Sequence, residues 1–278
     1  MKLKFECMNF YISVSFLILC IISFTTASTV DEDLSLNFEQ KQALDKFKAS
    51  VIPKLPHDYM KSDVYLIRWL RARNFNAKKA EELILENIKW RTDNSMDTIL
   101  EEDWADMEEE YPFKLNSHDK EGKPVFLGAF GHWDLRKAEV TGRFPRLMRY
   151  GERILEEEEV LIRKLQAEGK MVTRTVIIFD MDGFNIFQHG CARCINFLLQ
   201  FYSSYEDHHP GLMSKMFVVN NHPLVNTLLQ PFLVSLAPGT RDTVVLFNRN
   251  RAEYSKALLK YIDYDQLPEK YGGSKEEE

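Results

Sequence analysis

Two cysteines three residues apart are the first residues in this sequence whose spacing could serve a reaction. Cys191 and Cys194 form a C-x-x-C pair, a pattern that occurs in thiol oxidoreductases and in metal sites. Thioredoxin-type pairs open a helix directly after a strand, whereas this pair lies within FQHGCARCINFLLQFY, which we expect to be one continuous helix. A zinc site would need a second pair, and the sequence has none. The pattern therefore favours two free thiols on a packed helix face, with a thiol oxidoreductase as the weaker alternative.

Two other short patterns combine groups that could move protons or bind a metal. Asp180 and Asp182 could act as acid and base, but a strand that ends in D-x-D-G typically forms a turn whose carboxylates accept backbone amides. His208 and His209 precede a proline, and without a further ligand at helical spacing we interpret them as a helix end. The run Glu156–Glu159 is interpreted as the solvated face of a long amphipathic helix.

Several catalytic and cofactor-binding motifs are absent from the sequence. It contains no phosphate-binding P-loop, no G-x-G-x-x-G after a strand, no G-x-S-x-G elbow and no H-E-x-x-H. We therefore expect a protein that is not an enzyme and that needs neither a cofactor nor a metal.

Length and composition are those of a globular protein with one large domain or two small ones. The chain has 278 residues, of which 45% are hydrophobic and 28% are charged. Its net charge of −6 argues against a protein that binds nucleic acid by neutralising phosphates.

The first residues have the pattern of a secretory signal peptide. Lys2 and Lys4 precede an uncharged apolar run at 10–24, and small residues follow, which predicts cleavage after Ala27. The alternative is a membrane anchor through residues 10–24, but this run is shorter than the roughly 20 residues that span a bilayer. We therefore predict a secreted protein, or one in the lumen of the secretory pathway, with residues 1–27 as its signal peptide.

The rest of the chain changes from helices to alternating strands and helices. LNFEQKQALDKFKASV, SDVYLIRWLRARNF and NAKKAEELILENIKWR are predicted helices, with Ser62 and Asn76 as candidate caps. From about Tyr111 strands and helices alternate, and VTRTVIIFDMDG has the strongest strand pattern. This order predicts an α/β domain with a mostly parallel sheet, whose short first strand, GKPVFLGAF, could pair either way.

Six segments, in this order along the chain, resemble those of the CRAL-TRIO lipid-binding family. They are DVYLIRWLRARNFNAKKAEELILENIKWR, GKPVFLGAFGHWDLRK, TVIIFDMDG, HHPGLMSKMFVVNNHPLVNTLLQPFL, GTRDTVVLFN and DQLPEKYGG. The resemblance covers roughly residues 58–273 and rests on the six segments together. Members of this family carry phosphatidylinositol, phosphatidylcholine, α-tocopherol or retinaldehyde. The resemblance therefore implies a non-catalytic lipid carrier.

The resemblance also implies an α/β fold in which a mixed, mainly parallel sheet forms an apolar cavity closed by a gate helix. It divides the chain that follows the signal peptide into a helical module at 28–95, a CRAL-TRIO lipid-binding domain at 96–273 and an acidic tail at 274–278. Alternate residues of a strand point to opposite faces of the sheet, so Ile177 and Phe179 share one face. The family pattern favours this face as the cavity wall.

The stretch PLVNTLLQPFLVSLAPGTR, at 223–241, corresponds to the family's gate helix. Its apolar residues fall at helical spacing, and Pro231 weakens the helix where it would have to move. An ordinary core helix is the alternative. The predicted ligand contacts on sheet, neighbouring helix and gate are Phe126, Phe130, Ile177, Phe179, Phe197, Phe201, Met216, Val218, Val225, Leu228, Leu229, Phe232, Leu233 and Leu236.

Positions for a polar headgroup follow from the same resemblance. Members that bind phosphatidylinositol have a glutamate and a lysine where this chain has Gly211 and Thr243, although Arg73 and Thr240 match. Losing a carboxylate and a cation weakens contacts to inositol hydroxyls and phosphate. We therefore expect weak phosphatidylinositol exchange and, as cargo, phosphatidylcholine or a less polar terpenoid, sterol-like or fatty molecule. The predicted membrane or headgroup contacts are Arg68, Arg71, Arg73 and Thr240.

These inferences combine into one expectation about function. We predict a monomer that holds a hydrophobic lipid in an internal cavity and exchanges it during transient membrane contact. The alternative is a protein-interaction adaptor that keeps the fold but has a collapsed or unused pocket.

Overall fold

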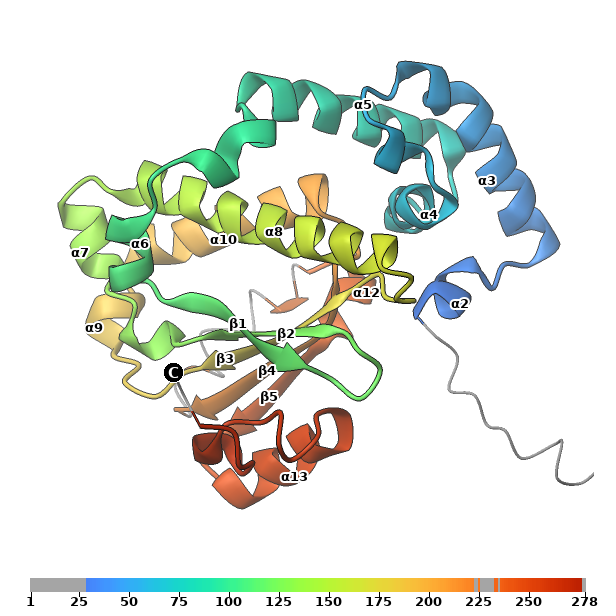
Figure 1. Cartoon of the computed structure of the whole chain (residues 1–278). Coiled ribbons are helices and arrows are strands. Elements are labelled where there is room, and N and C mark those ends of the chain that lie inside the picture. The colour runs from blue at the N-terminus through green and yellow to red at the C-terminus, as the bar shows by residue number, and fades with distance from the viewer. Residues whose placement is uncertain (1–28, 223–224, 226–232, 235, 277–278) are drawn as a thin grey trace, which may run out of the picture.

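The first part of the described chain is helical, as the sequence predicts. The computed structural model describes residues 29–222, 225, 233–234 and 236–276. The predicted caps are confirmed, because the Ser62 side chain accepts a hydrogen bond from Tyr65 N–H and the Asn76 side chain accepts one from Lys79 N–H. The helices and 3₁₀ turns of this part are α2 (Thr29–Leu34), α3 (Phe38–Val51), η1 (Ile52–Lys54), η2 (Asp58–Lys61), α4 (Asp63–Ala72) and α5 (Ala77–Asp93) (Figure 1).

Helices α3, α4 and α5 share a hydrophobic core of their own. Phe47, Leu66, Trp69 and Ile84 are among its fully buried members. Burying such side chains contributes about 1.5–3 kcal/mol each, so this helical layer has a substantial stabilising core. In Figure 1 the layer lies above the rest of the molecule, on the far side of α8 from the sheet.

The remaining chain alternates strands and helices around one sheet. Two elements, η3 and α6, connect it to the helical layer. The elements are η3 (Met96–Glu101), α6 (Ala105–Glu110), β1 (Phe113–His118), β2 (Pro124–Gly128), η4 (Phe130–His132), α7 (Leu135–Val140), α8 (Phe144–Ala167), β3 (Thr175–Asp180), α9 (Ile186–His189), α10 (Ala192–His208), β4 (Met213–Asn221), α12 (Pro238–Arg241), β5 (Val244–Asn248), α13 (Arg251–Tyr261) and η5 (Glu269–Tyr271).

The sheet is mixed and mainly parallel, as the resemblance implies. Its strand order is β1-β2-β3-β4-β5, with β1 antiparallel to β2 and the other neighbours parallel. The first strand, β1, was not predicted, because its sequence FKLNSH lacks a continuous apolar run. GKPVFLGAF supplies β2, which therefore pairs both ways, antiparallel with β1 and parallel with β3.

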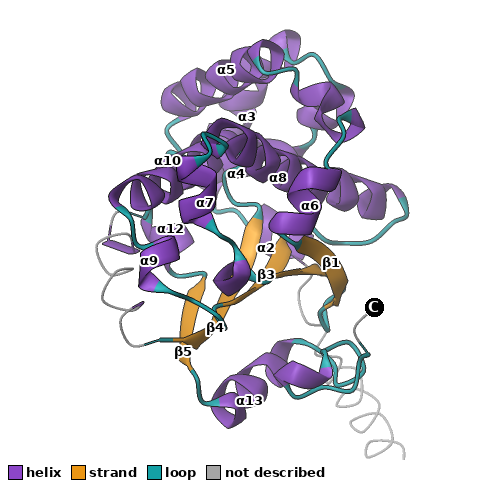
Figure 2. Cartoon of the chain, turned by 90° about the vertical axis from the view of Figure 1, so that its left-hand side faces the viewer, coloured by secondary structure: helices purple, strands orange, loops and turns teal. Residues whose placement is uncertain are grey.

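The two faces of the sheet are covered differently. Val176 and Ile178 point to the face where α13 packs, in a cluster with Tyr254 and Leu258. Figure 2 shows α13 below the sheet and α8 and α10 above it. Residues of the other parity, such as Ile177, point towards α8 and α10. The alternation predicted for this strand is therefore observed.

Helix α8 carries glutamates that are buried, contrary to the sequence interpretation of Glu156–Glu159 as a solvated face. Glu156 is 3% exposed, Glu158 1% and Glu159 4%. Glu157 is half-buried and pairs with Arg153 on the same helix. The interpretation fails because α8 lies between two layers, so Glu156, Glu158 and Glu159 meet side chains of other elements instead of solvent.

Glu152 of α8, also buried, accepts a hydrogen bond from Ser204 of α10, and the other three buried glutamates of the helix each meet a side chain from a different element. The partners come from α5, α4 and β3, so α8 joins the helical layer to the sheet. Charged or hydrogen-bonded partners are what buried carboxylates require. The pairs are Arg91–Glu156 at 2.7 Å, Arg68–Glu159 at 2.6 Å and Thr175–Glu158 at 2.5 Å.

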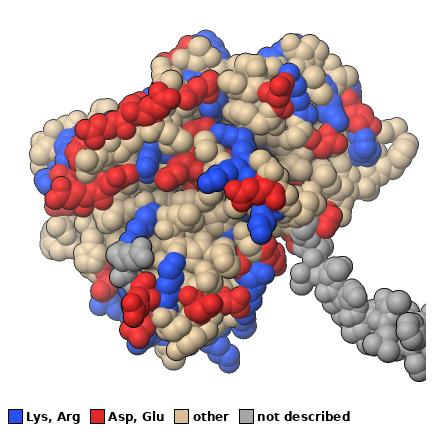
Figure 3. Space-filling view, viewed as in Figure 1, with Lys and Arg blue, Asp and Glu red and all other residues tan. Residues whose placement is uncertain are grey.

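The exposed side of α8 has a second set of ion pairs. Arg146 and Arg149 reach Glu102, and Arg143 reaches Asp106 and Glu110. On the face drawn in Figure 3, acidic and basic side chains lie beside one another. Exposed pairs of this kind contribute little each, so the buried pairs are the stronger connection.

The helix that was predicted as continuous through the cysteines is broken. The chain leaves α9 at His189, and Cys191 caps the start of α10 by accepting a hydrogen bond from Cys194 N–H. Cys191 and Cys194 are joined as a disulfide, so the expectation of two free thiols is wrong. The break follows Gly190, where an added Cβ would lie 2.8 Å from the Ile186 carbonyl oxygen.

Candidate ligand cavity and adjoining polar pocket

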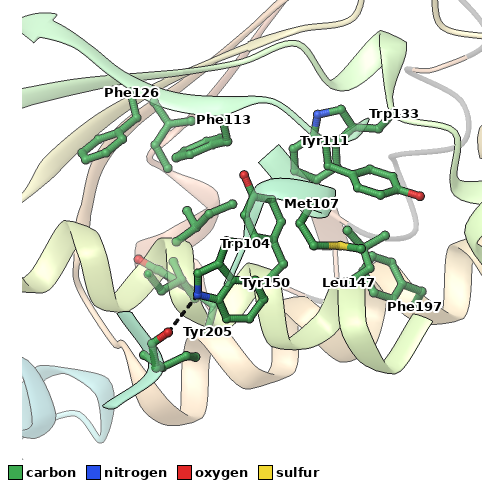
Figure 4. Close-up of a cluster of buried hydrophobic side chains, with 14 of the residues drawn as sticks. Trp104, Met107, Tyr111, Phe113, Phe126, Trp133, Leu147, Tyr150, Phe197 and Tyr205 are labelled. Carbon is green, nitrogen blue, oxygen red and sulfur yellow. Dashed lines mark hydrogen bonds between the residues drawn. The ribbon is translucent and has the colours of Figure 1, made fainter. Parts of the chain in front are cut away.

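An apolar cavity lies between the inner face of the sheet and helices α8 and α10. Its volume is about 220 Å³. Strand side chains form one wall, and helix side chains form the other. Figure 4 shows part of this layer, where Phe113 lies on the strand side and Leu147 and Tyr150 come from α8.

Most of the predicted ligand contacts lie on the wall of this cavity. Ten of the predicted residues line it, and they come from η4, β3, α10, β4 and the gate segment. Phe126 does not reach the wall, because it packs behind Phe113 with ring centroids 5.6 Å apart. Leu228, Leu229, Phe232 and Pro231 lie outside the described residues. The lining residues that were predicted are Phe130, Ile177, Phe179, Phe197, Phe201, Met216, Val218, Val225, Leu233 and Leu236.

Helix α8 supplies a wall that sequence reasoning missed. Its periodicity indicated an amphipathic helix, but a single sequence does not show that its apolar face meets a cavity. Gly151 belongs to this wall, and a Cβ there would lie 2.4 Å from the Phe201 ring, so α8 and α10 approach closely at this point. The lining residues from α8 are Leu147, Tyr150, Gly151, Ile154, Leu155 and Glu158.

The gate segment contributes a few described residues. Val225 is 1% exposed and Leu236 3%, whereas Val234 is 68% exposed. Leu233, next to Val234, lines the cavity. Of these two adjacent positions, Leu233 therefore faces the cavity and Val234 faces the solvent.

A polar pocket of about 480 Å³ adjoins the apolar cavity. Met213 and Thr240 line both. The pocket also contains Gly211 and Thr243, the positions at which the family pattern predicted a glutamate and a lysine. The structure thus brings three headgroup positions together, although they are separated in sequence.

The arginines of this pocket already have partners. Arg68 pairs with Glu159, and Arg163 pairs with both Glu156 and Glu159. Arg71 donates to the backbone carbonyl of Asp33 at 2.8 Å. Arg73 is not among the residues that line this pocket; it lies 3.7 Å from Asp207 and donates to the Ala72 carbonyl.

His209 forms the centre of a buried charge cluster beside both pockets. Its Nδ1 lies 3.0 Å from Glu159 Oε1, and its Nε2 lies 3.5 Å from Glu152 Oε2. Burial alone lowers the pKa of His209, but the two carboxylates outweigh it and raise the pKa to about 9. Burial opposes the charged form of Glu159 too and so raises its pKa, but the positive charges of Arg68 and His209 hold this pKa far below its usual range. His209 therefore ends helix α10, as the sequence predicts, and also pairs with buried carboxylates.

The remaining candidate groups are structural. The Asp180 side chain accepts hydrogen bonds from Asp182 N–H at 2.9 Å and from the Tyr271 hydroxyl at 2.7 Å, and Gly183 has a φ of +84°, which confirms the predicted turn. Over residues 29–222 and the later described positions, no group of three histidine, cysteine or acidic side chains is placed to hold a metal. Among the described helices, none has the length and apolar character that a membrane span needs.

Comparisons with known proteins agree with this architecture. The CRAL/TRIO domain matches residues 108–273. The chain is 29% identical over 219 residues to phosphatidylinositol/phosphatidylcholine transfer protein SFH7 of Arabidopsis thaliana, covering 75% of this chain and 38% of that protein. It is 28% identical over 251 residues to phosphatidylinositol/phosphatidylcholine transfer protein SFH12 of Arabidopsis thaliana, covering 85% and 44%. The crystal structure of Sfh5 superposes with a TM-score of 0.69 at 14% identity, covering 87% of this chain and 89% of that one.

The structure is a mixed α/β domain whose sheet backs an apolar cavity beside a polar pocket. The chain belongs to the CRAL/TRIO domain family, whose match at 108–273 covers more than half of its 278 residues. It spans less than half the length of SFH7 and of SFH12. The likeness to Sfh5 is one of fold.

The His209 cluster predicts a pH dependence of stability. A group whose pKa rises from 6.5 to about 9 on folding stabilises the protein fully below pH 6.5 and loses this contribution as pH rises through 9. The His209→Gln variant should therefore be less stable than the wild type at pH 6, by on the order of 2 kcal/mol. Urea unfolding at pH 6 to 9.5 measures this difference, which should shrink steadily as pH rises. A constant difference would contradict a charged His209.

Proposed function

We propose that this protein binds a lipid in its apolar cavity and transfers it between membranes without catalysing a reaction. The observation that carries the proposal is the cavity between the inner sheet face and α8 and α10, with its almost entirely apolar lining. Such a surface is costly to leave in water and favours an apolar ligand. An open cavity also favours a carrier over an adaptor with a collapsed pocket. The names of SFH7 and SFH12 support a lipid as the cargo.

The polar pocket supports an amphipathic lipid whose polar end lies near Thr240. Gly211 offers no carboxylate and Thr243 no cation to an inositol phosphate headgroup. Arg71 donates to backbone carbonyls, and a phosphate oxygen would be a stronger acceptor for it. These features favour phosphatidylcholine or a less polar lipid over phosphatidylinositol.

The gate segment supports opening at a membrane surface. Burial of each large apolar side chain is worth about 1.5–3 kcal/mol, so opening in water is costly, whereas a bilayer keeps the same side chains dry. Val234 is 68% exposed, and Phe187 on α9 is 83% exposed. Their exposure makes these two residues candidates for contact with a membrane.

We further propose that residues 1–27 are a signal peptide, so that the carrier works in the secretory pathway or outside the cell. Thr29, just after the predicted cleavage site, is buried and donates to the Met171 carbonyl. Cleavage after Ala27 would leave this contact intact. N-terminal sequencing of the native protein tests the proposal, and an intact Met1 would refute it.

Filling the cavity should abolish lipid binding without unfolding the protein. In Met216→Trp the indole would occupy space that is open in the cavity, so we expect co-purified lipid, measured by native mass spectrometry, to fall at least tenfold. Phe247→Trp, on the sheet face that packs against α13, is the matched control and should retain the lipid. Equal lipid content in the two variants, or none in the wild type, would contradict the carrier function.

Adjacent gate residues should have separable effects. Leu233→Asp places a charge on the cavity wall and should speed the loss of bound lipid in solution about tenfold or more. Val234→Asp changes an exposed position, so it should leave retention unchanged but slow transfer to anionic vesicles. Retention and vesicle transfer of a fluorescent lipid measure the two effects. If both variants behave like the wild type in both assays, the segment is not a gate.

The headgroup positions predict a preference among phospholipids. Transfer of fluorescent phosphatidylcholine should exceed that of phosphatidylinositol at least tenfold. In Thr243→Lys an added cation in the polar pocket should raise phosphatidylinositol transfer several-fold, and the double variant Thr243→Lys/Lys215→Thr, whose net charge is that of the wild type, should keep the gain. Brisk phosphatidylinositol transfer by the wild-type protein would overturn this preference.

A further inference from the structure

Glu158 is an unusual residue to find on the wall of an apolar cavity. It is 1% exposed and comes from α8, between Leu155 and the helix end. Its Oε2 lies 2.5 Å from the Thr175 hydroxyl of β3. Its Oε1 is buried and has no hydrogen-bond partner among the described residues. A buried carboxyl oxygen without a partner costs free energy that a suitable ligand could recover.

Other polar groups on the wall are already satisfied within the protein. The two ring nitrogens of His189 lie 2.8 Å and 3.2 Å from backbone carbonyls. The Tyr205 hydroxyl accepts from Met213 N–H, and Thr240 donates to Glu206. The Tyr150 hydroxyl is the other lining atom that is buried without a partner in the described structure. On the described wall of the apolar cavity, as distinct from the polar pocket, Glu158 and Tyr150 are therefore the two residues with an unpartnered polar atom for a ligand.

The carboxyl of Glu158 has the properties of a neutral hydrogen-bond donor. Burial raises its pKa to about 8, although Thr175 and His209 oppose the rise, so the group is mostly protonated at pH 7. Because Thr175 donates to Oε2, the proton of the neutral carboxyl is left on Oε1. Because Glu158 is among the residues that line the cavity, this O–H is available to a ligand bound there.

We propose that Glu158 is a ligand-binding residue that holds the uncharged hydroxyl of a lipid inside the apolar cavity. The inference rests on the proposed lipid-binding function and, within the less polar class of cargo, points to lipids with a hydroxyl group, such as fatty or terpenoid alcohols and sterols. A hydroxyl oxygen accepts from Oε1, whereas a hydrocarbon leaves Oε1 unpaired.

Competition between matched ligands tests the proposal on the full-length protein. Diphenylhexatriene, a fluorescent hydrocarbon, reports occupancy of the cavity, and 1-dodecanol and dodecane are the competitors. The measured quantity is the ratio of alcohol to alkane affinity in each protein. The free energy of moving each competitor out of water is the same for every variant, so it cancels when the ratios of two variants are compared. We expect this ratio to fall about tenfold in Glu158→Leu and to change less than threefold in Glu158→Gln, whose amide can still donate.

Tyr150→Phe is the control for the second unpartnered group and should leave the ratio unchanged. If Tyr150→Phe lowers the ratio and Glu158→Leu does not, the hydroxyl is held elsewhere and the proposal is wrong. If every variant binds diphenylhexatriene and has the same ratio of alcohol to alkane affinity as the wild type, Glu158 holds no ligand although the cavity does bind lipids. Failure of the wild type to bind the fluorophore would instead overturn the lipid-carrier function together with this inference. Thermal unfolding of each variant confirms that it is folded.

Discussion

The buried carboxylates of α8 are the constraint on which the other layers depend. A buried acidic group needs a partner, which for the charged Glu156 and Glu159 is an arginine of α5 or α4 and for Glu158 is the Thr175 hydroxyl of β3. Removing one partner from such a pair typically costs about 3–5 kcal/mol, because an unpaired charge is left behind. The helical layer, α8 and the sheet are thus tied to one another by groups that tolerate little displacement.

The same connections explain why a cavity can persist beside a well-packed core. Near its end, α8 is held against β3 by Glu158, and near its start it is held by Arg146 and Arg149, which reach Glu102. Polar contacts therefore set the position of α8. Its apolar side chains do not have to fill the whole space above Ile177 and the rest of the inner sheet face.

The sequence was most informative where a local pattern decides the structure. Alternation in β3 predicted that Ile177 and Phe179 share a face, and the caps at Ser62 and Asn76 were visible as residue types. It was least informative where the deciding partner is distant. Arg91 is 65 positions from Glu156, so nothing next to the glutamate run indicates its burial. That Gly211 and Thr243 line one pocket could be anticipated only from the resemblance, because no local sequence pattern connects them.

The absence of a side chain at Gly151 couples the size of the cavity to the spacing of two helices. An added Cβ would lie 2.4 Å from Phe201, so any larger residue has to move that ring or push α10 away from α8. Either movement changes the far wall of the cavity, and a shift of α10 would also move its C-cap His209 relative to Glu152 and Glu159. The size of the residue at this position can therefore set the room that the cavity leaves for a bound lipid, independently of the groups that bind its polar end.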